Sequence, residues 1–226
     1  MASKNKKAGR SSVWILSILL FGPALIIILF SKSCTNHFQT LDSYGNIGKF
    51  ELKTNDGQIL TEKDLKGHIT IFTTIQNTCP DSCGIDLWFI KEHLFKRIYT
   101  NAKKLKHVRI VSIVTDTKGN AAAIDDVLLY RLKDIVKDYD EKYWKLAEGN
   151  PKDIFNFEHN GINVYEQTGD EFLGDRMFLE TLLLIDDEGN LRFVRYGRSE
   201  SMVRDFHDGF TLLQKEFEDK KRNKSK

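Results

Sequence analysis

Short apolar runs alternate along this chain with longer segments in which apolar residues recur every three or four positions. The short runs are rich in Val, Ile, Leu and Thr and predict buried strands at 68–75 (HITIFTTI), 108–115 (VRIVSIVT) and 181–186 (TLLLID). The longer segments predict helices at 85–99, 123–139 and 202–217. A further strand, LRFVRYG, follows the turn signal DEGN and closes a hairpin. This alternation predicts an α/β domain with a mixed sheet flanked by helices.

The first thirty residues predict a membrane anchor. Residues 12–30 form an uncharged apolar run that, as a helix, nearly spans a hydrocarbon core of about 30 Å. Four basic residues precede the run and Lys32 alone closely follows it, which places the N-terminus in the cytoplasm. A cleaved signal peptide is the alternative, but the run is longer than the usual apolar stretch of about 7–15 residues. We therefore expect a single-pass membrane protein with its C-terminal domain exported, to a bacterial periplasm or an equivalent compartment.

Charge and length favour one exported domain. The chain holds 34 basic and 32 acidic residues, a formal net charge of +2, and its basic residues gather only near the two ends. No nucleic-acid surface is predicted from this distribution. The expected organisation is a basic lead at 1–11, the anchor at 12–30, a linker at 31–44, the domain at 45–219, and a solvated, frayed basic tail at 220–226.

Two of the three cysteines carry the most specific chemistry of the chain. Cys79 and Cys83 lie between the predicted strand at 68–75 and the predicted helix at 85–99. Thiols at the start of a helix ionise readily, because unpaired N–H groups and the helix dipole stabilise negative charge there. Pro80 suits the first helical turn. Four positions apart, the thiols share one helix face, where they either grip a soft metal ion or form a disulfide. A purely structural disulfide is less favoured, since so short a loop gains little from cross-linking.

From about residue 50 to residue 217 the chain resembles the Sco/SenC family of thioredoxin-fold, membrane-anchored copper chaperones of cytochrome c oxidase assembly. The most specific match is TCPDSC after a buried strand. Further matches are FELKTNDGQILTEKDLKGHITIF, IVSIVTDTKGN, YWKLAEG as a tryptophan-containing turn, and LLLIDDEGNLRFVRYG. The second of these has Thr117 where a proline is usual. The resemblance implies a thioredoxin-like mixed sheet flanked by helices. It also implies that Cys79 and Cys83 bind one copper ion together with a distant histidine.

That histidine has no counterpart here, which makes the chain atypical of the family it resembles. It is expected just before the strand at 181–186, where this chain has Phe178, and no histidine occurs from 160 to 205. Met177 is one candidate replacement, because thioether sulfur binds cuprous copper well. His159, on a connecting segment, is the other. The third copper ligand therefore stays open.

Two further functions fit the same residues. As an exported thiol–disulfide oxidoreductase, the protein would attack partner cysteines through Cys79 and resolve through Cys83, without stable copper binding. As a non-catalytic assembly protein, it would dock partners and keep the pair as a structural disulfide. The main prediction is copper-site assembly of cytochrome c oxidase, with a copper-receiving oxidase subunit or another copper chaperone as partner. Cys34 is expected to be unpaired, lipidated or engaged with a partner.

The remaining histidines and large aromatic residues are assigned structural roles. The aromatic residues expected in the core are Trp88, Phe89, Phe95 and Trp144. His68 and His107 are expected to be solvated at strand ends, His207 to lie on an exposed helix face, and His93 to be a surface or half-buried helix residue.

Overall fold

The computed structural model describes residues 19–23, 26, 40–78, 83–155, 158–159, 162–163, 181–197 and 199–224. The chain divides into two units, Met1–Gln39 and Thr40–Lys226, and the second contains the folded domain. Within the described ranges, no helix is both long and apolar enough to cross a membrane. Most of the anchor predicted at 12–30 lies outside those ranges.

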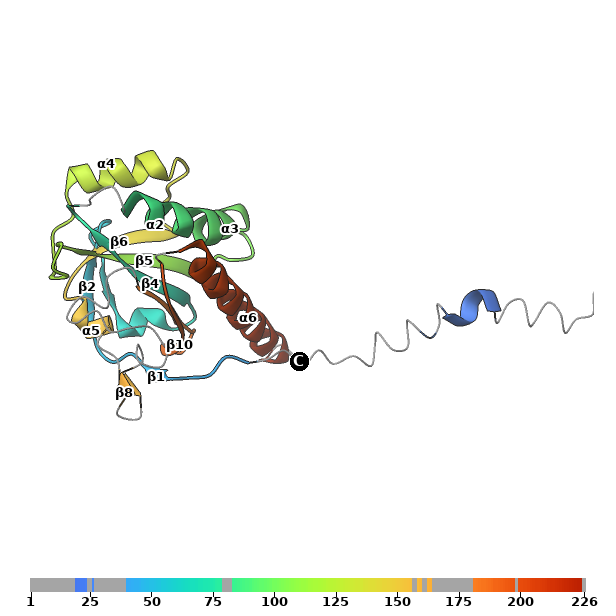
Figure 1. The fold of residues 1–226 in the computed structure, drawn as a ribbon. Coiled ribbons are helices and arrows are strands. Elements are labelled where there is room, and N and C mark those ends of the chain that lie inside the picture. Colours follow the sequence, from blue (N-terminus) through green and yellow to red (C-terminus); the bar gives the residue numbers. More distant parts are fainter. Residues whose placement is uncertain are drawn as a thin grey trace, which may run out of the picture. The chain divides into compact units, whose positions relative to one another are not determined.

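A mixed sheet of eight strands, in the order β1-β10-β9-β4-β5-β6-β2-β3, runs through the folded unit (Figure 1). Its strands are β1 (Gly45–Asn46), β2 (Glu51–Thr54), β3 (Ile59–Thr61), β4 (Ile69–Gln76), β5 (Val108–Thr115), β6 (Trp144–Glu148), β9 (Thr181–Ile185) and β10 (Asn190–Tyr196). The central strands β4, β5 and β6 are parallel, and β9 joins β4 in antiparallel register. The strands predicted at 68–75, 108–115 and 181–186 are confirmed, whereas β6 forms where the sequence indicated a turn.

Helices cover both faces of this sheet. One face carries α2 (Cys83–Ile90), the π-helical turn η2 (Lys91–Phe95), α3 (Lys96–Thr100), α4 (Asp126–Ile135) and α6 (Glu200–Lys224). The other carries the 3₁₀ turn η1 (Glu62–Leu65) and α5 (Lys152–Phe155). A hydrophobic core lies on each face of the sheet. Successive residues of β4 point to opposite faces, so Ile71 belongs to the core under α2 and α6, and Phe72 to the core under α5. A separate two-stranded hairpin joins β7 (Glu158–His159) to β8 (Ile162–Asn163).

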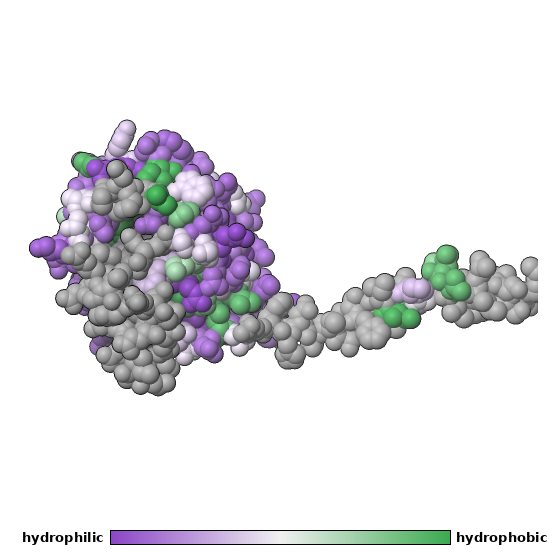
Figure 2. All heavy atoms as spheres, in the orientation of Figure 1, coloured by the Kyte–Doolittle hydropathy of each residue, from purple (hydrophilic) through white to green (hydrophobic). Residues whose placement is uncertain are grey.

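The helix predicted at 85–99 forms, but the residues that it buries against the sheet differ in part from those predicted. The buried stripe recurs at helical spacing and consists of Leu87, Ile90, Leu94 and Ile98. Trp88 is 46% exposed and Ile85 56%, so the prediction that Trp88 lies in the core is wrong. Phe89 is half-buried, and Phe95 and Trp144 are buried as predicted. Figure 2 shows one face of the folded unit, on which a few hydrophobic residues lie among mainly hydrophilic ones.

The other two predicted helices differ from expectation in length. The segment predicted at 123–139 is helical only from Asp126 to Ile135, where the Asp125 carboxylate caps the first turn by accepting the Leu128 N–H at 2.7 Å. The last helix runs on to Lys224, so most of the tail expected to be frayed is helical. Helix α6 therefore spans 25 residues.

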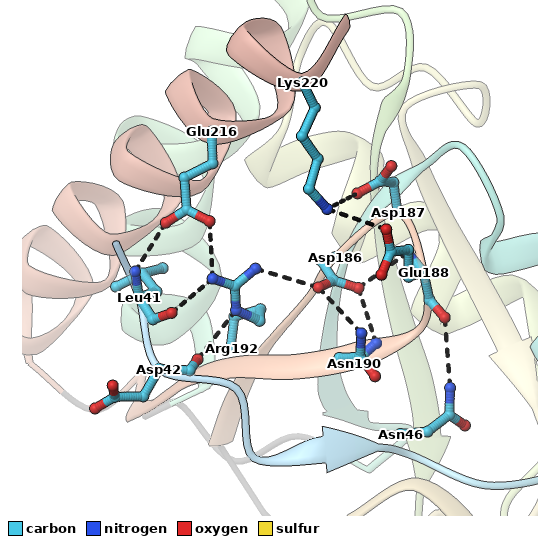
Figure 3. Close-up of polar contacts among 10 residues, drawn as sticks. All are labelled: Leu41, Asp42, Asn46, Asp186, Asp187, Glu188, Asn190, Arg192, Glu216 and Lys220. Carbon is cyan, nitrogen blue, oxygen red and sulfur yellow. Dashed lines mark hydrogen bonds and ion pairs between the residues drawn. The ribbon is translucent and has the colours of Figure 1, made fainter. Parts of the chain in front are cut away.

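A buried arginine ties the start of the folded unit to the hairpin and to α6 (Figure 3). The Arg192 guanidinium donates to Asp186 at 3.2 Å, to Glu216 at 2.8 Å, and to the carbonyl oxygens of Leu41 (2.6 Å) and Asp42 (3.0 Å). Glu216 in turn accepts the Leu41 N–H at 2.8 Å. We call these five residues the Arg192 network. It holds the first residues of the domain in place, because Arg192 bonds at once to Leu41 and Asp42, to Asp186 of the hairpin and to Glu216 of α6.

Candidate functional site

The cysteine segment joins the middle of the sheet to its first covering helix. The chain leaves β4 at Gln76, and the Asn77 N–H continues the parallel pairing by donating to the Thr115 carbonyl at 2.9 Å. It returns at Cys83, the first residue of α2. Cys79 and the side chain of Cys83 lie outside the described residues. The backbone nevertheless places Cys83 at a helix N-terminus, where the dipole favours a thiolate.

A small pocket of about 30 Å³ opens beside this junction. Its walls are the last residues of β4 (73–76), Asp86, Leu87 and Ile90 of α2, and Gly197 after β10. The lining is largely apolar, with Asp86 contributing a carboxylate and no histidine among the lining residues. A group that approaches the first turn of α2 from this side therefore meets apolar walls and one carboxylate.

Two buried polar atoms near the junction have no hydrogen-bond partner among the residues that the structure describes. They are the Oδ1 of Asn77, just after β4, and the Oγ1 of Thr115, the last residue of β5. Buried polar atoms are usually paired, so each such atom calls for an explanation. The sequence analysis did not single out Asn77. Its position two residues before Cys79, in QNTC, is the sequence feature that could have identified it as part of the site.

The turn after β5 lies at the same end of the sheet and is held by its own carboxylate. Asp116 accepts the N–H groups of Lys118 and Asn120, both at 2.8 Å, and the Asn120 amide at 2.9 Å. Hydrogen bonds from Asn120, and then from Lys118, lower the pKa of Asp116 below its usual value. These bonds give the turn a fixed shape, although Thr117 stands where a proline was expected.

Comparison with known proteins relates this arrangement to known folds. No protein-family model and no curated protein matches the sequence. Among solved structures, BsSco, a member of the Sco family of cytochrome c oxidase assembly proteins, superposes with a TM-score of 0.51 at 18% identity, covering 78% of this chain and 98% of that one. The chain has a Sco-like thioredoxin fold.

Two further matches are weaker. Yeast Sco1 with copper bound is 20% identical, with a TM-score of 0.47 over 75% of this chain and 93% of that one. A SCO1/SenC family lipoprotein from Bacillus anthracis str. Ames is 17% identical, with a TM-score of 0.47 over 75% of this chain and 95% of that one. At these identities the likeness concerns the fold alone.

The predicted copper ligands remain predictions. Cys79 and Met177 lie outside the described residues, and of Cys83 and His159 only the backbone is described. His159 belongs to β7 and pairs with Ile162 of β8. Among the described side chains, no group of three or more His, Cys, Asp or Glu could hold a metal ion. The structure therefore brings no third ligand to the pair within its described part.

Two histidines of the helical layer, His207 and His93, contact side chains of neighbouring helices. His207 of α6 accepts a hydrogen bond from Arg97 of α3, which also donates to Thr211 at 2.7 Å. Burial, and then the charge of Arg97, lower the pKa of His207, so this imidazole is held neutral. His93 of η2 is half-buried, with its Nε2 3.6 Å from a carboxylate oxygen of Glu200.

His107 was expected to be solvated at the edge of a strand, and this is wrong. Its ring stacks on Phe217 of α6, with centroids 4.1 Å apart and planes 16° apart, and its Nε2 is buried with no hydrogen-bond partner in the described part of the chain. Burial is the main cause that lowers the pKa of His107. It directly precedes β5 at the amino end of the central strands, so it lies away from the cysteine junction.

Proposed function

We propose that this protein is an exported, membrane-anchored member of the Sco/SenC family that acts in copper-site assembly of cytochrome c oxidase. Cys79 and Cys83 carry cuprous copper as cargo and pass it to thiolates of the recipient, an oxidase subunit or another copper chaperone. The family's known role, the Sco-like fold and the sequence TCPDSC support this assignment.

One observation carries the proposal. The Cys-x3-Cys segment spans the junction between the carboxyl end of a central parallel strand and the N-terminus of the next helix. Ligands in α/β sheets bind outside the carboxyl ends of the strands, and the helix dipole stabilises the thiolate form that a metal requires. Two thiolates four positions apart in the sequence suit cuprous copper, which accepts soft sulfur ligands.

The second candidate is a thiol–disulfide oxidoreductase. No histidine is among the described lining residues of the pocket, and none occurs from 160 to 205 in the sequence. This favours the oxidoreductase, because thiol–disulfide exchange needs no third metal ligand. In this chemistry the Cys79 thiolate attacks a partner disulfide, and one partner sulfur leaves as a thiolate. Cys83 then displaces the other partner sulfur, so the partner gains two electrons and two thiols while Cys79 and Cys83 become a disulfide.

An anaerobic titration separates the two candidates. The fully reduced full chain in detergent is titrated with cuprous copper against a competing chelator, beside the variants Cys79→Ser and Cys83→Ser. Cys34→Ser is the matched control, because it removes a thiol outside the pair. Binding of one copper per chain that survives in Cys34→Ser and is lost in both other variants is the expected result.

Two more variants address the third ligand. Met177→Ala or His159→Ala should weaken copper binding selectively if that residue replaces the family's histidine. If the chelator keeps the copper from the unmutated chain, copper delivery by this protein alone is refuted. The reduction potential of the Cys79–Cys83 pair then decides whether the oxidoreductase function stands.

A further inference from the structure

The exposed large apolar side chains of the folded unit gather on two helices. One of those in the described part of this unit, Ile59, lies on the edge strand β3. The others lie on the segment α2–α3 (Ile85, Trp88 and Tyr99) and on α4 (Val127 and Tyr130). Single exposed apolar residues are common on proteins, but neighbouring ones mark surfaces that contact another molecule.

Helices α2 and α4 lie side by side and run in the same direction. Helix α2 connects the parallel strands β4 and β5, and α4 connects β5 to the parallel strand β6. The two helices contact each other, and Figure 1 shows them as neighbours in the layer that covers one face of the sheet. Helix α6 packs on β10, so the strand order β10-β9-β4-β5-β6 places α6 on the other side of α2.

Trp88 lies on the flank of α2 that faces α4. Asp86 and Ile90 line the pocket together with Gly197, which comes shortly before α6, so their flank of α2 faces α6. Trp88 is two positions from each of them. At about 100° per residue, Trp88 therefore lies on nearly the opposite flank, the one that faces α4.

Val127 lies on the flank of α4 that faces α2. On α2, Trp88 comes one residue after Leu87, which is buried. On a neighbouring helix of the same direction, the flank that faces back comes one residue before a buried position. Val127 has this place, because it directly precedes the buried Leu128.

Ile85 and Tyr130 complete this surface on the outer side of the two helices. Each stands two positions from a buried residue of its own helix, Leu87 or Leu128, and so lies about 160° around the helix from it. We call the four exposed side chains the α2–α4 patch: Ile85, Trp88, Val127 and Tyr130.

The patch has the area of one side of a small interface. Trp88 is 46% exposed and Tyr130 72%, which amounts to about 250 Å², since a whole aromatic side chain covers roughly 150–250 Å². Ile85 and Val127, each more than half exposed, bring the total to about 350 Å². Two copies that meet patch to patch then bury about 700 Å² of apolar surface, or about 1,100 Å² in all at the apolar share of about 65% in homodimers. That area exceeds the roughly 1,000 Å² expected of a specific interface.

Balanced charge suits this patch to a second copy of itself. The exposed charges of α4 cancel, because the helix carries two acidic and two basic residues, Asp126, Arg131, Lys133 and Asp134. Next to the patch on the other helix, Glu92 pairs with Lys96 at 3.2 Å. A surface with an excess of one sign repels its own copy and favours a partner of opposite charge. The α2–α4 patch has no such excess.

We propose that two copies of this chain associate through the α2–α4 patch, as a two-fold pair in which Trp88 and Tyr130 of each copy pack against the patch of the other. Two-fold pairs are the commonest oligomers, and a few aromatic residues often carry most of the binding energy of an interface. Since the area lies at the small end for specific interfaces, the pair is in reversible equilibrium with single chains. The inference uses only the folded unit and does not rest on the proposed copper or thiol chemistry.

Sedimentation equilibrium of the full chain tests the association. The chain is held in a density-matched detergent with its thiols reduced, so that no disulfide joins two copies, and its concentration is varied. The mass of the unmutated protein should rise with concentration from one chain to two. Trp88→Ser/Tyr130→Ser should raise the dissociation constant more than about 100-fold, because the pair loses four aromatic side chains and each contributes a factor of about five or more.

A matched pair of single variants locates the surface. Val127→Ser removes a side chain that is 55% exposed in the patch, and Ile59→Ser removes one that is 52% exposed on β3. Val127→Ser should weaken the association at least about fivefold, whereas Ile59→Ser should leave it unchanged. Far-UV circular dichroism should show the same fold in every variant, since the substituted side chains are exposed.

Three results would overturn the inference. They are a single-chain mass at every concentration, an association that Trp88→Ser/Tyr130→Ser leaves unchanged, and equal weakening by Val127→Ser and Ile59→Ser. The second result would show that another part of the chain joins the copies. Because no step of the measurement uses copper or disulfide exchange, these results are separate from those of the copper titration.

Discussion

Replacing Arg192 by methionine should lower the free energy of unfolding by about 3–5 kcal/mol. The three side chains that form the ion pairs of the Arg192 network are almost fully buried, with exposed fractions of 9% for Arg192, 3% for Asp186 and 13% for Glu216. Methionine fills similar space but removes the arginine that pairs with two buried carboxylates and that donates to the carbonyl groups of Leu41 and Asp42. The loss is large beside a total stability of about 5–15 kcal/mol.

Urea unfolding followed by far-UV circular dichroism measures this loss. Lys220→Gln is the control. Lys220 pairs with Glu188 through side chains that are 43% and 61% exposed, and with Asp187 at the long distance of 3.7 Å. Removing these pairs should change stability by less than about 1 kcal/mol. A double-mutant cycle of Arg192→Met with Glu216→Gln should show a coupling energy of about 0.5–3 kcal/mol. An Arg192→Met loss below about 1 kcal/mol would refute the argument that these charges depend on one another.

Three further changes test the packing. Trp144→Phe should destabilise the fold by about 1–3 kcal/mol in urea unfolding, because it removes the buried 2.8 Å hydrogen bond from the indole to Ser112. Gly209→Ala should also destabilise it by about 1–3 kcal/mol, since an added Cβ would come within 2.8 Å of the Phe193 ring and this clash exceeds the roughly 1 kcal/mol that alanine contributes in a helix. Stability should fall with pH below about 6.5, because the folded state binds the His107 proton more weakly than the unfolded chain does. Unfolding temperatures measured from pH 7.5 to 5 should show a shallower fall in His107→Phe.

Two of these changes have a matched control, and for the third a contrary outcome is defined. Ser112→Ala removes the same hydrogen bond as Trp144→Phe without altering the aromatic packing, so a similar loss would attribute the effect to the bond. For Gly209→Ala, an increase in stability would show that Phe193 moves aside without cost. His68→Phe is the control for the pH experiment, and an equal change of slope in both histidine variants would contradict the role assigned to His107.

Much of the fold followed from local pattern. The strands at 68–75 and 108–115 were predictable because a strand buried on both faces is apolar at nearly every position. β6 was missed, since its run Trp144–Glu148 mixes polar and apolar residues and becomes a strand through pairing with β5. The helix after Cys83 was predicted, but its sequence offered apolar residues on more than one side, and only contact with the sheet decided that Trp88 faces solvent.

The sequence by itself determined the cysteine pair, its place between a strand and a helix, and the apolar run that predicts an anchor, because each is a property of neighbouring residues. Tertiary structure alone decided the pocket beside α2, the stack of His107 on Phe217 and the Arg192 network. Their members stand up to 175 positions apart, as for Leu41 and Glu216, and no local preference encodes such contacts. The fold brings them together. The strand order places β10 beside both β1 and β9, and α6 packs on one face of the sheet.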